Sequence, residues 1–84
     1  MTIYQAIVLA NTIAQDNEAV KNYGEYLVLD NLIGDCFRAL KAGQDNIEGV
    51  YKKWNCCKLF ALDVIQAAYS SAKAIFDNCR IETD

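Results

Sequence analysis

The sequence of 84 residues contains no histidine and no proline. Histidine is the commonest general base and a frequent metal ligand at neutral pH, so its absence argues against acid–base catalysis and against most metal centres. The absence of proline leaves helix formation unhindered along the whole chain. We therefore expect no catalytic residues, no metal and no cofactor, and we predict that the protein is not an enzyme.

Positive charge is also scarce, because eight lysines and arginines stand against eleven aspartates and glutamates and give a net charge of −3. An acidic balance argues against nucleic acid and against an anionic membrane surface as partners, since both attract basic surfaces. The apolar stretch at the N-terminus is shorter than the roughly 20 residues that a membrane span requires. We therefore expect no membrane association, and we expect a protein partner with a basic surface.

Four cysteines lie at positions 36, 56, 57 and 79. Four cysteines in a small secreted protein would suggest two disulfides, but the adjacent pair and the helix-rich composition favour reduced thiols in the cytoplasm. On a helix Cys56 and Cys57 point about 100° apart, which is a poor geometry for one zinc ion. The N-terminus also lacks the basic region of a signal peptide. We predict a cytoplasmic protein with buried, reduced thiols.

Apolar residues are abundant and make up 54% of the chain, which is enough for a core even at this length. Their spacing is helical throughout. We predict one all-α domain over residues 1–84, a compact bundle of three or four helices. The helices are expected over residues 2–22, 25–42 and 45–79, the last either continuous or broken near 55–58.

The first predicted helix, residues 2–22, has no charged residue before Asp16. Its expected buried face consists of Ile3, Ala6, Ile7, Ala10, Ile13 and Ala14, with Val20 extending it. Val8 and Leu9 lie off this stripe, so the helix is apolar around more of its circumference than an ordinary surface helix. We expect it to be either sandwiched between neighbours or used in assembly, and the pair Asp16 and Asn17 is a point where a new helix can begin.

The second predicted helix, residues 25–42, has a clear apolar stripe. The expected buried residues are Tyr26, Leu29, Ile33, Cys36, Phe37 and Leu40. Asp35, Arg38 and Lys41 are expected on the opposite, solvent-facing side. Gly43 is expected to end the helix, because glycine adopts positive φ without a steric penalty.

The third predicted helix begins at a sequence, Asp45 to Glu48, that resembles a capping box. Its apolar seam consists of Ile47, Val50, Trp54, Cys57, Ala61, Val64, Ala68, Ser71 and Ile75, beside a second stripe of Leu62, Ile65, Tyr69, Ala72, Phe76 and Cys79. We predict that Trp54 lies in the core. An unbroken helix would be about 50 Å long, which exceeds a compact chain of this length. It must therefore break, or its overhang must pack on a second subunit.

Acidic residues and tyrosines are interleaved in the first half of the chain, and we predict that they form a partner-binding surface: Asp16, Glu18, Tyr23, Glu25, Tyr26, Asp30 and Asp35. Tyrosine is a common interface anchor, and the acids would attract a basic partner. The expected function is to bind and inhibit, or adapt, another protein by occluding its functional surface. Small immunity proteins, antitoxins and phage inhibitors are similar in size, charge and helicity alone. An ordinary solvated face also accounts for these acids.

Two alternative functions remain open from the sequence. The uncharged first helix and the long third helix would suit an obligate homodimer with a scaffolding role. The segment Lys52 to Lys58, in which basic residues surround Trp54, would suit a small nucleic-acid-binding protein.

Overall fold

The computed structural model describes residues 1–23, 26–43, 47–57 and 60–82, without the side chains of residues 23, 26–28 and 55–57. This part of the chain contains five α-helices: α1 (Ile3–Ala14), α2 (Glu18–Tyr23), α3 (Tyr26–Lys41), α4 (Glu48–Cys57) and α5 (Leu62–Asn78). The predicted all-α class is confirmed. None of the helices in the described ranges is both long enough and apolar enough to cross a bilayer.

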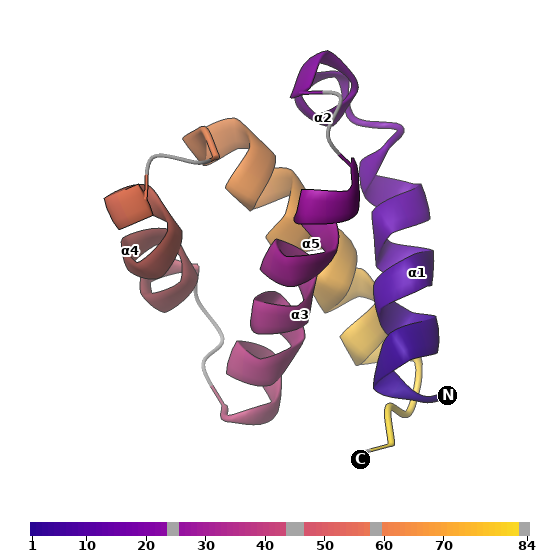
Figure 1. The fold of residues 1–84 in the computed structure, drawn as a ribbon. Helices are drawn as coiled ribbons and strands as arrows, with labels where there is room; N and C mark the ends of the chain where they lie inside the picture. The colour runs from indigo at the N-terminus through magenta and orange to yellow at the C-terminus, as the bar shows by residue number, and fades with distance from the viewer. Residues whose placement is uncertain (24–25, 44–46, 58–59, 83–84) are drawn as a thin grey trace.

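Helices α3 and α5 form the centre of the bundle (Figure 1). Helix α1 packs on both of them along one edge, and α4 packs on both at the opposite edge. The short α2 packs on α5. The molecule measures 30 × 23 × 18 Å, so no helix extends beyond the globule.

The core is built mainly from the predicted stripes of α3 and α5. On α3 the buried residues include Leu29, Leu32, Ile33, Cys36, Phe37 and Leu40, and on α5 they include Val64, Ile65, Ala68, Ala72 and Ile75. Several expected core positions are more exposed than predicted, including Ala61, which is exposed. Trp54 is half-buried against the core, and Leu62 at the start of α5 is 50% exposed.

The predicted helix over residues 2–22 is divided into α1 and α2. Helix α1 starts with a capping box: the Thr2 hydroxyl accepts a hydrogen bond from the Gln5 N–H, and the Gln5 side-chain oxygen accepts one from the Thr2 N–H. After α1 ends, the side-chain oxygen of Asn17 accepts from the Ala19 N–H at 2.9 Å and starts α2. The prediction of a single helix over residues 2–22 was therefore wrong. The second helix begins after Asp16 and Asn17, the pair that the sequence indicated as a possible start.

The predicted helix over residues 45–79 is also broken. Phe60 and Ala61, which lie between α4 and α5, are not helical. Helix α4 ends at Cys57, so the break begins within the predicted segment 55–58. An unbroken helix would be about 50 Å long, whereas the longest dimension of the folded molecule is 30 Å.

Helix α3 ends at Lys41 as glycine at position 43 predicts. Gly43 has a φ of 85°, and its N–H donates to the Leu40 carbonyl at 3.1 Å. Asp45, the first residue of the predicted capping box, lies outside the described residues.

The segment after α5 closes against the start of α1. The Met1 amino group donates to the Arg80 carbonyl at 2.9 Å, and the Glu82 N–H donates to the Met1 carbonyl at 2.8 Å. Thr2 and Glu82 form an isolated parallel bridge. These bonds fix the N-terminal end of α1 on the bundle, next to the end of α5 (Figure 1).

The two glycines Gly34 and Gly43 provide a matched stability test. A Cβ at Gly34, inside α3, would lie 3.5 Å from Ile7 Cδ1, which is ordinary van der Waals contact. Gly34→Ala should therefore stabilise the fold by about 0.5–1 kcal/mol, because it reduces the entropy of the unfolded chain. Gly43→Ala should cost about 1–2 kcal/mol, because alanine is strained at positive φ. Urea denaturation followed by circular dichroism measures both, and a loss of stability in Gly34→Ala would contradict the α1–α3 packing.

Candidate functional site

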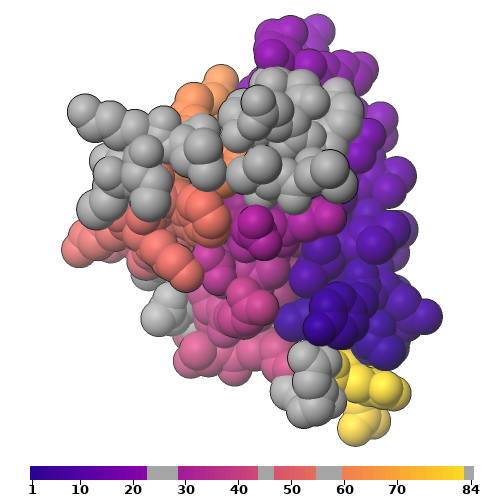
Figure 2. Space-filling view, in the orientation of Figure 1, coloured from indigo at the N-terminus to yellow at the C-terminus, as the bar shows by residue number. Residues whose placement is uncertain are grey.

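Helix α1 exposes large apolar side chains to solvent. Tyr4 is 72% exposed, Val8 64%, Leu9 40% and Ile13 42%. With the exposed polar residues between them they form what we call the α1 face: Tyr4, Gln5, Val8, Leu9, Thr12 and Ile13. No charged side chain occurs on α1. Figure 2 shows the surface of α1, in indigo, along one side of the molecule.

The buried face of α1 explains why these large groups point outward. It consists mainly of alanines, because Ala6, Ala10 and Ala14 are at most 1% exposed. These residues are four positions apart and therefore line one side of the helix. Small side chains let α1 approach α3 and α5 closely along this row, and Ile3 at the start of the helix is buried on the same side. The expected place of Ile13 on the buried face was thus wrong.

The sequence left two roles open for this helix, burial between neighbouring helices or use in assembly. Its exposure in the described part of the chain agrees with a role in assembly. Scattered single apolar residues on a protein surface are ordinary, but a contiguous patch is typical of an interaction site. Here four large apolar residues lie within about three turns of one uncharged helix. The α1 face is therefore the candidate functional site.

Shallow grooves flank the α1 face on both sides. On the α3 side, Tyr4 and Val8 line a groove together with Ile7, Asp30, Asn31, Gly34 and Arg38. On the α5 side, Ile13 lines a depression together with Asp16, Asn17, Asp63, Gln66, Ala67, Ser70 and Ser71. Charged groups thus occur only at the margins of the α1 face.

A buried amide fixes α1 to α3. Asn11 is 8% exposed, and its Nδ2 donates to Asp30 Oδ1 on α3. The Gln15 Nε2 donates in turn to Asn11 Oδ1 at 2.9 Å. A buried polar side chain that is satisfied in this way fixes the position of a helix. The sequence contained one signal for it, an asparagine in the middle of an otherwise apolar stretch.

The predicted acidic binding surface is only partly assembled. Asp16 and Glu18 are exposed at the junction of α1 and α2. Asp30 and Asp35 instead make hydrogen bonds within the fold. Glu25 and the side chains of Tyr23 and Tyr26 lie outside the described residues. Among the described acids of this set, only Asp16 and Glu18 are exposed.

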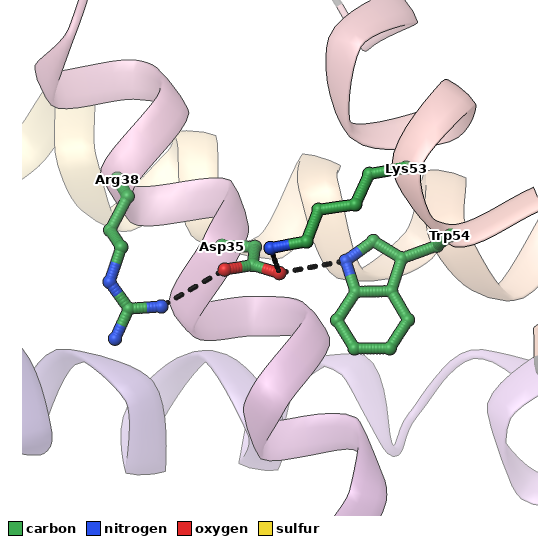
Figure 3. Close-up of polar contacts among 4 residues, drawn as sticks. All are labelled: Asp35, Arg38, Lys53 and Trp54. Carbon is green, nitrogen blue, oxygen red and sulfur yellow. Dashed lines mark hydrogen bonds and ion pairs between the residues drawn. The ribbon is translucent and has the colours of Figure 1, made fainter. Parts of the chain in front are cut away.

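Asp35 on α3 makes polar contacts with two residues of α4 (Figure 3). Its side chain is 15% exposed, so the expected solvent-facing position was wrong. Its Oδ2 accepts from Trp54 Nε1 and pairs with Lys53 Nζ, both at 2.9 Å, while Oδ1 accepts from Arg38 Nη1 at 3.0 Å. The sequence did not reveal this role, because Trp54 lies on a different helix and was expected in the core.

The basic segment Lys52 to Lys58 is in part engaged with Asp35. Lys52 and Lys53 are exposed, and Lys53 Nζ also lies 5.8 Å from the centre of the Trp54 ring. Trp54 packs edge-on against Phe60, with ring centroids 5.2 Å apart. Lys58 lies outside the described residues. The ion pair with Asp35 lowers the positive potential that this segment can offer to a phosphate backbone.

The described thiols differ in exposure. Cys36 is fully buried, as predicted, whereas Cys79 is half-buried. Burial raises the pKa of the Cys36 thiol to about 12, and the negative charge of Asp35 acts in the same direction. The side chains of Cys56 and Cys57 lie outside the described residues. Within the described ranges, no three histidine, cysteine or acidic side chains are grouped as metal ligands.

Removal of the Asp35 side chain should destabilise the fold by about 2 kcal/mol. Asp35→Ala leaves the partly buried Trp54 N–H without its charged acceptor, whereas the exposed lysine and arginine partners contribute little. Asp35→Asn keeps a neutral acceptor and should lose about half as much. The control is Asp77→Ala, which breaks the exposed Lys73–Asp77 pair and should cost at most about 0.5 kcal/mol. Equal urea midpoints for the Asp35→Ala and Asp77→Ala variants would contradict this role of Asp35.

The Cys36 thiol should resist labelling in the folded protein. With a pKa of about 12, only about one molecule in ten thousand carries the thiolate at pH 8. We expect a thiol reagent to label Cys79 before Cys36 under native conditions, and both rapidly in denaturant. Peptide mass spectrometry identifies the labelled positions. Labelling of Cys36 at the rate of an unfolded thiol would contradict its burial.

Comparison with known proteins gives no assignment. No protein-family model matches the chain, and no curated protein or solved structure matches it. The function is therefore inferred from the surfaces of this chain itself, among which the exposed, uncharged α1 face is the strongest candidate.

Proposed function

We propose that this protein is a binding domain that inhibits or adapts a partner protein by covering part of its surface, and that the α1 face makes the contact. The observation that carries the proposal is the exposure of Tyr4, Val8, Leu9 and Ile13 on one uncharged helix. The acidic residues predicted from the sequence contribute at the margin, through Asp16 and Glu18.

The α1 face has the composition of an interface centre. Burial of apolar surface contributes roughly 25 cal/mol per Å² that is removed from water. Tyr4 offers a large area with few rotatable bonds, which is characteristic of residues that dominate binding energy. Because the α1 face has no charge, a partner can cover it without desolvating an ion, which would be costly.

Charge at the margin supports a basic partner. Asp16 and Glu18 are exposed just beyond the C-terminal end of α1, and Asp63 on α5 lines the same depression as Asp16. The chain as a whole carries a net charge of −3. Such charges accelerate encounter with a partner of opposite sign and orient it, while the apolar centre sets the lifetime of the complex.

Affinity capture with matched variants tests the proposal. Val8→Asp places a charge in the centre of the α1 face, and Leu62→Asp places the same charge on an exposed apolar residue of α5. Tagged wild type and both variants are incubated with an extract of the producing cells. Untagged chain is added to the extract, so that a second copy of the chain can be retained as well as another protein. Proteins retained by wild type and by Leu62→Asp should be lost from Val8→Asp, because an unpaired charge in an apolar contact is strongly unfavourable.

Circular dichroism is the control for folding, and both variants should keep wild-type helicity because both positions are at least half exposed. Retention of the same proteins by all three chains would show that the α1 face is not the working surface. Loss from the Leu62→Asp variant alone would move the binding surface to the start of α5.

A further inference from the structure

The apolar residues of the α1 face form two half-rows. Tyr4 and Val8 are one turn apart and follow the α3 side over the first half of α1. Leu9 and Ile13 are also one turn apart. They follow the α5 side over the second half of α1, where Ile13 lines the depression beside α5. Each side of the helix is therefore apolar along only half of its length.

We propose that the protein covering the α1 face is a second copy of this chain, packed face to face with its α1 antiparallel to the first. This inference rests on the proposed function, because it names the partner of the same surface. The basic group that a second copy brings to the acidic margin is Arg38, since the chain itself has no net positive charge. A two-fold axis that runs between the two helices, perpendicular to both and level with the midpoint between Val8 and Leu9, places the first half of one helix against the second half of the other. The α3 sides of the two copies stay together, and so do their α5 sides.

This arrangement completes both apolar rows. On the α3 side, Tyr4 and Val8 of one copy continue into Val8 and Tyr4 of the other. On the α5 side, Leu9 and Ile13 join their counterparts in the same way. The polar residues Gln5 and Thr12 lie at matching distances on either side of the axis. Two-fold interfaces require such self-complementarity, since the same surface serves both subunits.

The charges beside the α1 face are complementary in the same arrangement. Helix α3 runs antiparallel to α1: Asp30 bonds to Asn11 near one end of the groove, and Arg38 lies beside Tyr4 at the other end. The two-fold axis brings Arg38 of each copy toward Asp30 of the other. No like charges meet at the centre, because α1 has none. Opposed α1 dipoles also favour the antiparallel pair.

The size of the surface sets the expected strength of the pair. An interface of standard size buries about 800 Å² per partner, roughly one sixth of the 5172 Å² surface of this chain. Helix α1 is only about 18 Å long, so the flanking grooves of α3 and α5 must also contribute. The pair therefore lies at the small end of stable interfaces, and we expect a dissociation constant of about 1–100 µM.

Sedimentation equilibrium of the full chain, from about 1 µM to about 1 mM, tests the pairing. The mass of wild type should rise from 9.4 kDa toward twice that value with concentration. Val8→Asp and Val8→Lys should each raise the dissociation constant at least about 100-fold, because like charges meet at the axis. An equimolar mixture of the two variants should form a heterodimer with an affinity within about 10-fold of wild type. Leu62→Asp should pair as wild type does.

A wild-type mass of 9.4 kDa at every concentration would overturn the pairing, as would a dimer unaffected by charge at Val8. Arg38→Glu provides a second variant away from the axis, with an expected loss of about 10-fold that shrinks at high salt. The two proposals fail separately. A monomeric wild type whose capture of another protein is lost in Val8→Asp would overturn self-pairing and leave the proposed binding function intact.

Discussion

The close packing of alanines on α1 against α3 and α5 is the constraint on which the rest of the structure depends. A helix in a small bundle normally buries its largest apolar groups and exposes its smallest. Here Ala6, Ala10 and Ala14 are buried, while Tyr4 and Val8 are mostly in solvent. Close approach of the helices strengthens dispersion contacts between them and leaves little room for large side chains beside these alanines. The α1 face is the direct consequence of this packing.

In the described part of the chain, polar contacts also hold α1 and α4 to α3. Asn11 bonds to Asp30 and fixes α1 on α3, and Trp54 bonds to Asp35 and fixes α4 on α3. Both acids had been predicted as part of a binding surface, and both are used inside the fold. The contact surface that we propose therefore differs from the acidic stretch seen in the sequence: its centre is apolar and its acids lie at the margin.

Periodicity predicted most of the fold, because the stripes of α3 and α5 bury side chains large enough to mark one side of each helix. On α1 it was right for Ala6, Ala10 and Ala14 but wrong for Ile13. Alanine, valine, leucine and isoleucine all count as apolar, so only packing distance separates inside from outside. Hence Ile13 was assigned to the core. It also failed for Asp35, because a hydrogen bond to Trp54 across 19 positions leaves no local pattern. The α1 face itself was visible from the sequence as an absence of charge, though not as an exposed surface.

The most direct measurement is an NMR dilution series of the isotopically labelled chain, which reports on each residue of the α1 face separately. The account predicts that signals of Val8, Leu9 and Ile13 shift progressively as the concentration rises, while those of Leu62 on α5 stay constant. It also predicts that at the lowest concentration these methyl groups contact water. Shifts confined to α4, or concentration-independent burial of the Val8 and Leu9 methyl groups within a monomer, would contradict the claim that α1 offers an open protein-binding surface.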